Sequence, residues 1–123
     1  MAFTVKDSGE RARFETGAQR DLSAGKGRYE LLSPHAIKRL AQLYETGALK
    51  YDARNWEKGI SADRCLDSAL RHLFQYLAGD RTEDHAAAVM FNISALIHYE
   101  ETGREDLWSA MPWPFPKEAT SGG

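Results

Sequence analysis

The chain has 123 residues, of which 42% are hydrophobic and 28% are charged, and its formal net charge is -2. This length predicts one domain, with a core that needs no metal or disulfide to hold it together. The near-neutral charge argues against a protein that binds nucleic acid through a basic face. The single cysteine, Cys65, excludes an intrachain disulfide and a cysteine-rich zinc site.

The sequence gives no sign of a membrane segment or an export signal. No apolar run approaches the ~18 residues that cross a bilayer. The N-terminal segment MAFTVKDSGERARFE lacks the apolar core of a signal peptide. We therefore expect a cytoplasmic protein with no membrane partner and no nucleic-acid partner.

Residues 1–32 are predicted to form a basic, loop-like arm, because glycines and cations are mixed there without hydrophobic periodicity. Lys26 and Arg28 flank a glycine in the run GKGRY, and Arg20 lies upstream in the run GAQRD. Lysine and arginine pair with phosphate oxygens, so these three cations are candidate phosphate ligands. The alternative is a solvated basic loop without a ligand.

Three helices are predicted between residues 33 and 103, from the spacing of apolar residues and from capping residues. The predicted N-caps are Ser33, Ser61 and Thr82. The predicted ends lie near Lys50, Gly79 and Gly103. Residues 52–59, between the first two helices, are predicted to be a loop.

The predicted core faces of the helices differ in extent. On the second helix the expected core residues are Leu66, Ala69, Leu70, Leu73, Phe74 and Leu77. The third helix is apolar on nearly every side from residue 86 to residue 97, so we expect it to be buried. Three helices are too few to cover it completely, which predicts a homo-oligomer, either a dimer or a tetramer.

The tail, residues 104–123, carries Trp108, Trp113 and Phe115 among prolines that prevent a helix. We expect these rings to pack on the domain or on another subunit. The whole chain, 1–123, is thus predicted to be a single all-α domain. It would be a compact helical bundle completed by oligomerisation, with a loop-rich arm (1–32), a helical core (33–103) and an aromatic tail.

Polar residues on the second and third helices are candidates for chemistry. His85 and Asn92 lie about two turns apart on one face of the third helix. An unpaired buried polar group costs about 1–3 kcal/mol, so the two either make structural hydrogen bonds or line a ligand cavity. On the second helix, Asp67 and Arg71 form a surface pair or belong to a site, and His72 lies on the other flank. Asp67 is favoured over His72 as a metal ligand.

The loop after the first helix combines Lys50, Tyr51, Asn55 and Trp56. This mixture suits a nucleotide, because rings stack on a base and an amide reads its edge. The same aromatic residues would also serve to anchor a long loop. Glu45 precedes the loop beside the apolar stripe, and it faces either the interior or the solvent.

Five segments of the chain, taken in order, resemble one family. They are TGAQRD, GKGRYELLSP, YETGALKYDARNWEKG, LDSALRHLFQYLAGD and EDHAAAVMFNISAL, and the resemblance covers roughly residues 16 to 101. This series resembles the phage and bacterial dATP/dGTP diphosphohydrolase N-terminal domain family. That family is similar to the all-α, MazG-like nucleoside triphosphate pyrophosphohydrolases.

The resemblance implies an oligomeric helical enzyme that cuts dGTP or dATP to the monophosphate and pyrophosphate. It also implies a divalent metal, Mg²⁺ or Mn²⁺, with Co²⁺ as a further option. MazG-like enzymes commonly hold Mg²⁺ with ExxE and ExxD motifs, whereas the matching helices here have fewer carboxylates and more imidazoles. Imidazole suits Mn²⁺, Co²⁺ or Zn²⁺ better than Mg²⁺. In some phages a member of the family supplies dGMP for 2-aminoadenine synthesis, which would place this protein in the host cytoplasm.

On this resemblance we expect three groups of site residues. The expected catalytic residues are Glu45, Asp67 and His85. The expected oxygen ligands of the metal are Glu45, Asp67 and Asp84. The expected substrate-binding residues are Arg20, Lys26, Arg28, Lys50, Tyr51, Asn55, Trp56, Arg71, His72 and Asn92. The alternative hypothesis is a non-catalytic, oligomeric helical module that binds or regulates a partner, in which the polar residues of the third helix are structural.

Overall fold

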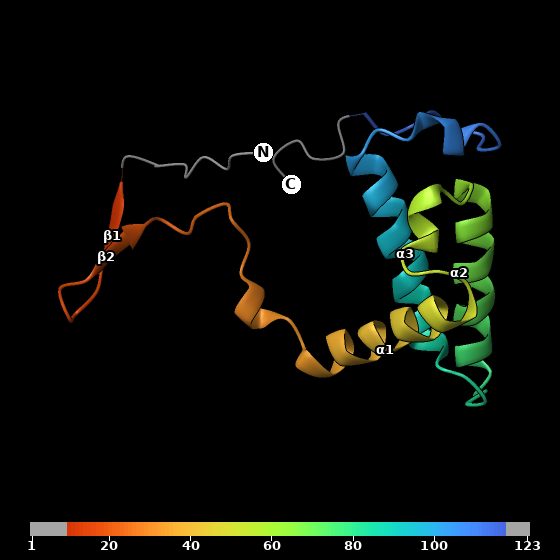
Figure 1. The fold of residues 1–123 in the computed structure, drawn as a ribbon, viewed down its shortest axis with the longest axis horizontal. Coiled ribbons are helices and arrows are strands. Elements are labelled where there is room, and N and C mark those ends of the chain that lie inside the picture. Colours follow the sequence, from red (N-terminus) through yellow and green to blue (C-terminus); the bar gives the residue numbers. More distant parts are fainter. Residues whose placement is uncertain (1–9, 118–123) are drawn as a thin grey trace. The chain divides into compact units, whose positions relative to one another are not determined.

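The computed structural model describes residues 10–117, which form two compact units that divide between Leu32 and Ser33. The N-terminal unit holds two short strands, and the C-terminal unit holds three α-helices, which Figure 1 labels in chain order. The predicted helical class is therefore confirmed. Within residues 10–117, none of the helices combines the length and the apolar character needed to cross a bilayer.

The N-terminal unit is built around a short hairpin. Strands β1 (Arg11–Arg13) and β2 (Gln19–Asp21) pair antiparallel, and Arg11 Nη1 lies 2.6 Å from Asp21 Oδ1. Gly17 has a φ of 90° in the connecting turn, a value that glycine adopts without a steric penalty. The arm therefore contains a hairpin that the sequence analysis did not predict, because three-residue polar strands show no usable alternation.

The first helix of the C-terminal unit begins and ends where its capping residues predict. Helix α1 spans Pro34–Lys50, and Ser33 Oγ accepts a hydrogen bond from the Ala36 amide at 3.2 Å. Helix α2 spans Ala62–Leu77 after the predicted cap Ser61. Capping chemistry thus accounts for the start of α1, whereas Ser61 occupies the predicted N-cap position of α2 without a capping hydrogen bond from its side chain.

The third helix begins later than predicted. Helix α3 spans His85–Glu101, and its N-cap is Asp84, whose Oδ1 accepts from the Ala87 amide at 3.1 Å. The predicted cap, Thr82, is wrong, because its hydroxyl and amide both donate to Asp80 Oδ1, at 2.7 and 2.8 Å. The carboxylate of Asp84 also suits the positive end of the helix better than a hydroxyl does.

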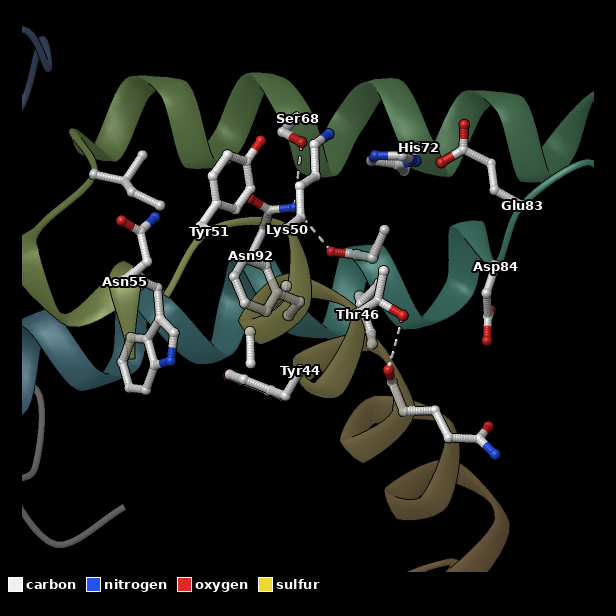
Figure 2. Close-up of a pocket in the computed structure, with 18 of the residues that line it drawn as sticks. Tyr44, Thr46, Lys50, Tyr51, Asn55, Ser68, His72, Glu83, Asp84 and Asn92 are labelled. Carbon is white, nitrogen blue, oxygen red and sulfur yellow. Dashed lines mark hydrogen bonds between the residues drawn. The ribbon is translucent and has the colours of Figure 1, made fainter. Parts of the chain in front are cut away.

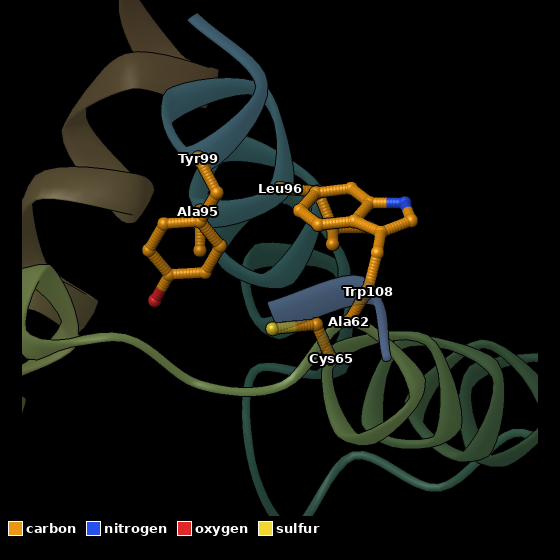
Figure 3. Packing of buried hydrophobic residues seen from close by; sticks show 6 residues of the cluster. All are labelled: Ala62, Cys65, Ala95, Leu96, Tyr99 and Trp108. Carbon is orange, nitrogen blue, oxygen red and sulfur yellow. The ribbon is translucent and has the colours of Figure 1, made fainter. Parts of the chain in front are cut away.

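Helices α2 and α3 pack closely through small side chains. The buried residues of α2 are Ala62, Cys65 and Ala69. The buried alanines of α3 are Ala87, Ala88 and Ala95. The core cluster adds Leu96, Tyr99 and Trp108, which Figure 3 shows around the Cys65 thiol. Burial raises the pKa of this thiol to about 11.

The predicted core face of α2 is only partly correct. Ala69 is buried and Leu66 packs against the core, whereas four large residues are each at least half exposed. They are Leu70, Leu73, Phe74 and Leu77. The apolar stripe predicts which side of the helix is hydrophobic. In the structure, α3 packs instead on the neighbouring side of α2, where alanines allow the two helices to approach more closely.

Of the three aromatic residues of the tail that were expected to pack on the domain, Trp108 and Phe115 do. Trp108 ends the 3₁₀ helix η3 (Glu105–Trp108), is buried, and contacts Phe115 edge to face with ring centroids 4.9 Å apart. Trp113 remains exposed. The tail therefore covers one end of the α2–α3 core. The predicted tail also includes residues 118–123, which lie outside the described residues.

Tyr99 of α3 anchors the loop between α1 and α2 through hydrogen bonds. The Tyr99 hydroxyl donates to the carbonyl of Trp56 and accepts from the Ile60 amide at 3.1 Å. Between these two anchors the chain forms the 3₁₀ helix η2 (Asn55–Lys58), which the loop prediction did not include, and then turns at Gly59. Gly59 has a φ of 111°, outside the range of other residues.

We expect Gly59→Ala to lower the free energy of unfolding by about 1–3 kcal/mol, because its backbone conformation strains any side chain. An added Cβ would also lie 2.6 Å from Arg104 Nη2 and 3.1 Å from Leu107 Cδ2. The matched control is Gly47→Ala in α1, where a Cβ meets nothing within 4 Å. It should raise stability by up to about 1 kcal/mol. Urea unfolding of both variants tests this, and equal effects would contradict it.

Candidate functional site

A pocket of about 830 Å³ opens in the helical unit between α1, the loop that follows it, α2 and α3. Figure 2 shows Tyr51 and Asn55 at one end and His72, Glu83 and Asp84 at the other, with Lys50 and Asn92 between them. A volume of this size falls in the range of pockets that bind cofactors and nucleotides. Its two ends differ in chemistry.

One end of the pocket is aromatic. The Tyr44 ring lies 5.0 Å from the Phe91 ring and 5.9 Å from the Trp56 ring, and Tyr51 is exposed beside them. Tyr99 fixes this part of the loop through the Trp56 carbonyl, so the indole has a defined position. Aromatic faces next to an amide form a surface on which a heterocyclic base can stack and be read.

Positive charge predominates over the rest of the pocket. Five cationic side chains line it: Arg39, Lys50, Arg54, Arg64 and Arg71. Three carboxylates line it: Asp52, Glu83 and Asp84. Arg39 Nε donates to Asp84 Oδ2 at 2.8 Å, whereas Arg71 lies 3.7 Å from Asp67 in an exposed pair of low energy. The pocket therefore favours an anionic ligand.

Asn92 lies under the middle of the pocket. Its amide nitrogen donates to the Ala88 carbonyl at 2.8 Å and to Ser68 Oγ at 3.3 Å. The residue is buried and also lines the pocket. Both sequence hypotheses for this residue, structural bonding and cavity lining, are thus compatible with its position.

A pair of histidines joins α2 to α3 at the acidic end of the pocket. His72 Nδ1 and His85 Nδ1 are 2.9 Å apart, and His85 Nε2 lies 3.2 Å from Asp80 Oδ2. The last contact is an ion-pair distance without the alignment of a full hydrogen bond. Within the described part of the chain, His72, Glu83 and His85 form a cluster that could hold a metal ion. They offer one ligand atom each, within 4.8 Å of one another.

The protonation of this end follows from its surroundings. Burial lowers the pKa of His72, the charge of Glu83 opposes that change, and the charges of His85 and Arg71 reinforce it. Hydrogen bonds from Thr82, followed by the close contact with His85, lower the pKa of Asp80 to about 2. At neutral pH the site therefore combines a neutral imidazole with ionised carboxylates.

The structure brings together many of the predicted site residues and leaves others apart. Those that line the pocket are Lys50, Tyr51, Asn55, Trp56, Arg71, His72, Asp84 and Asn92. His85 is buried and reaches the pocket through His72. Glu45 and Asp67 are exposed and do not line it, and their proposed roles stay predictions. Arg20, Lys26 and Arg28 belong to the N-terminal unit, where Arg28 pairs with Glu30 at 3.0 Å.

Asp80, Glu83 and two arginines that line the pocket were missed. Glu83 precedes His85 by two residues. The short run EDH, two carboxylates followed by a histidine, was the signal in the sequence that could have indicated Glu83. Asp80 gave no such signal in the sequence, because its contact with His85 depends on the path of the connection between α2 and α3. Arg39 and Arg64 are ordinary helix-surface cations in the sequence, and their approach to the pocket depends on helix packing.

A comparison with protein families identifies a match over most of the helical unit and part of the N-terminal unit. The family model described as dATP/dGTP diphosphohydrolase, N-terminal, matches residues 16–107. No curated protein and no solved structure matches the chain. The matched region includes every residue that lines the pocket.

The Asp84–Arg39 pair should make stability depend on pH in the acid range. The hydrogen bond from Arg39 lowers the pKa of Asp84 from 3.8 to about 2. Because the folded value is the lower one, the stabilisation is complete above pH 4 and is lost as pH falls toward 2. Asp84→Asn keeps a capping oxygen but removes this charge, at a cost of up to about 1 kcal/mol at pH 7, since the pair is partly exposed.

Urea unfolding between pH 7 and pH 2.5 tests this prediction. The difference between the native chain and Asp84→Asn should shrink steadily below pH 4. In an Arg39→Gln background the same substitution should show a much weaker pH dependence. A difference that stays constant across the acid range would show that the ion pair does not hold the carboxylate.

Proposed function

Since the chain belongs to the dATP/dGTP diphosphohydrolase N-terminal family, we propose that it hydrolyses dATP or dGTP to the monophosphate and pyrophosphate. The family's name is that of a hydrolase acting on these two nucleotides, and the matched model describes an N-terminal domain. The observation that supports the proposal most directly is the division of one pocket into an aromatic end and a charged end with metal-capable groups.

The aromatic end would hold the base. Tyr51 offers a ring face, Trp56 is fixed by Tyr99, and the Asn55 amide can donate to or accept from a purine edge. Stacking tolerates any base, so selection between purines rests on the amide. Substrate bound in this way would extend its phosphates along Lys50 toward the histidine pair (Figure 2).

The charged end would hold the triphosphate. Lys50, Arg64 and Arg71 line the pocket and could pair with phosphate oxygens. They would stabilise the charge that develops on departing pyrophosphate. Arg20, Lys26 and Arg28 stay predicted phosphate ligands from the N-terminal unit.

His72, Glu83 and His85 offer nitrogen and oxygen donors that fit a divalent cation such as Mn²⁺ or Mg²⁺. When bound, such an ion neutralises phosphate charge and makes a water molecule more acidic. Among the carboxylates at this end, Asp84 is a weak base because Arg39 holds its pKa at about 2. Glu83 is therefore the better acceptor, through the carboxylate oxygen that does not face the ion, for the proton of the water that would attack the α-phosphorus and displace pyrophosphate. Such an activity would fit a cytoplasmic role in supplying dGMP for 2-aminoadenine synthesis in a phage.

A second candidate function is a non-catalytic helical module. The hydrogen bonds of Asn92 to Ala88 and Ser68 pair a buried amide without a ligand, which favours this alternative. Thermal melting with a deoxynucleotide and Mn²⁺ or Mg²⁺ separates the two, because an enzyme should be stabilised most by the combination. A flat response to all four nucleotides would favour the binding module.

The direct test of the enzyme hypothesis is a product assay with each deoxynucleoside triphosphate and each metal. Chromatography should resolve monophosphate plus pyrophosphate from deoxynucleoside plus triphosphate. The proposal expects the first pair of products with dATP or dGTP. Release of triphosphate, or no turnover with any metal, would overturn it.

The effect of Asn92→Leu distinguishes a pocket residue from a purely structural one. If Asn92 contacts the nucleotide, the variant should lose at least tenfold in turnover with little change in stability, because a buried amide is replaced by an apolar group of similar size. The control is Glu101→Gln, an exposed residue of the same helix outside the pocket lining, which should remain active. A variant destabilised by about 1–3 kcal/mol but fully active when folded would contradict this role.

We propose a second copy of the chain as the partner of the exposed face of α2. Four large apolar residues within about two turns are too many for a solvated helix face, and Ile93 and Ile97 of α3 are also exposed. This supports the predicted homo-oligomer, dimer or tetramer.

Phe74→Glu should weaken this association at least tenfold, because it places a charge in the apolar face. Light scattering over a range of concentrations measures the change. Leu49→Glu, at the exposed end of α1, is the control and should leave the molar mass unchanged. A chain that is already monomeric would contradict the proposed partner.

A further inference from the structure

The histidine pair between α2 and α3 has the arrangement of two ligands of one metal ion. We propose that His72, His85 and Glu83 form a transition-metal site, and that Asp80 positions His85 for it. The use of this ion in nucleotide hydrolysis rests on the proposed function, whereas binding of the ion does not.

The distance between the two ring nitrogens indicates a coordination geometry. His72 Nδ1 and His85 Nδ1 are 2.9 Å apart. With metal–nitrogen bonds of about 2.1 Å, two ligands at a right angle lie about 3 Å apart, and two ligands at the tetrahedral angle lie about 3.4 Å apart. The observed spacing lies nearer the right-angle value, and it is also the usual length of a hydrogen bond between two rings.

Asp80 provides independent support. Its Oδ2 lies 3.2 Å from His85 Nε2, and its Oδ1 is held by the amide and hydroxyl of Thr82. A carboxylate beside Nε2 favours the proton on that nitrogen, which leaves a lone pair on Nδ1, toward His72. A metal-bound histidine almost always presents its other ring nitrogen to such a partner. The His85 side chain is fully buried, so its ring has little freedom to turn away.

Glu83 supplies the oxygen donor, and its side chain opens the site to the pocket. Figure 2 shows its carboxylate pointing toward the His72 ring. Both residues line the pocket, while His85 lies behind them. A site with two imidazoles and one carboxylate, open on one side, leaves positions for water or phosphate oxygens.

The donor set also indicates the class of metal. Imidazole nitrogen suits transition-metal ions such as Co²⁺, Ni²⁺ or Zn²⁺, and a carboxylate with water also suits Mn²⁺, whereas Mg²⁺ prefers a shell of oxygens. Octahedral geometry favours Mn²⁺ or Co²⁺ over Zn²⁺, which prefers four ligands in structural sites. The competing account is a histidine–histidine hydrogen bond with no ion, and it predicts no metal affinity above that of the protein surface.

The test is a titration of the nucleotide-free protein with Co²⁺ and with Mn²⁺. Bound Co²⁺ should show the weak visible absorption of an octahedral ion, and the spin-echo spectrum of bound Mn²⁺ should show coupling to imidazole nitrogen. His72→Gln and Glu83→Gln should each raise the dissociation constant at least tenfold. The control His35→Gln removes an exposed imidazole at the start of α1 and should bind the ions as the native chain does.

Asp80→Asn tests the positioning role separately. It removes the charge beside Nε2 without removing a ligand, so metal affinity should fall about 10–100-fold. The nitrogen coupling of the ion that still binds should change, which a purely structural role of Asp80 would not produce. Affinity equal to the native value would overturn this role.

The outcomes separate this inference from the proposed function. Tight binding with nitrogen coupling but no hydrolysis of any nucleotide would leave the site standing and overturn the enzyme. Hydrolysis with Mg²⁺ that is unaffected by His72→Gln, together with no nitrogen coupling, would overturn the site and leave the enzyme standing. Equal metal affinity in the native chain and His72→Gln would overturn the site whatever the activity.

Discussion

The close approach of α2 and α3 is the constraint on which the rest of the helical unit depends. Ala69 lies one turn before His72, and Ala88 lies one turn after His85, so small side chains flank the histidine pair on both helices. Side chains no larger than a methyl group let the backbones come near enough for two imidazoles to meet. A larger residue at either alanine would push the helices apart and lengthen the nitrogen–nitrogen distance. The geometry of the charged end is thus set by residues with no chemistry of their own.

Local signals in the sequence were sufficient to predict where the helices lie along the chain, but not which surfaces pack against each helix. Ser33 and Pro34 determine the start of α1 through contacts within four residues, and this start was predicted correctly. Thr82 failed as a cap because Asp80, two residues away, competes for its hydroxyl. The exposed stripe through Phe74 was taken for core, since periodicity shows that a face is apolar without showing what covers it.

The candidate site shows the same division. The aromatic loop and Asn92 could be proposed from the sequence because their residue types alone suggest a polar cavity with ring faces. The meeting of His72 with His85 could not, because thirteen residues and a turn separate them and no pattern reports their distance. Carboxylates were favoured as metal ligands by analogy; Glu45 and Asp67 are exposed and outside the pocket lining, and their roles stay predictions.

Because Cys65 is buried, the reactivity of its thiol reports local opening of the helical core. The thiol is 1% exposed in the α2–α3 core, and its pKa of about 11 keeps it protonated and unreactive at neutral pH. An alkylating reagent can reach it only when the surrounding core, which includes α3 and Trp108, opens locally. The rate of modification therefore counts these openings, and the same openings would draw His72 away from His85. A metal ion bound to His72 and His85 would make these openings rarer, so it would slow the modification of Cys65.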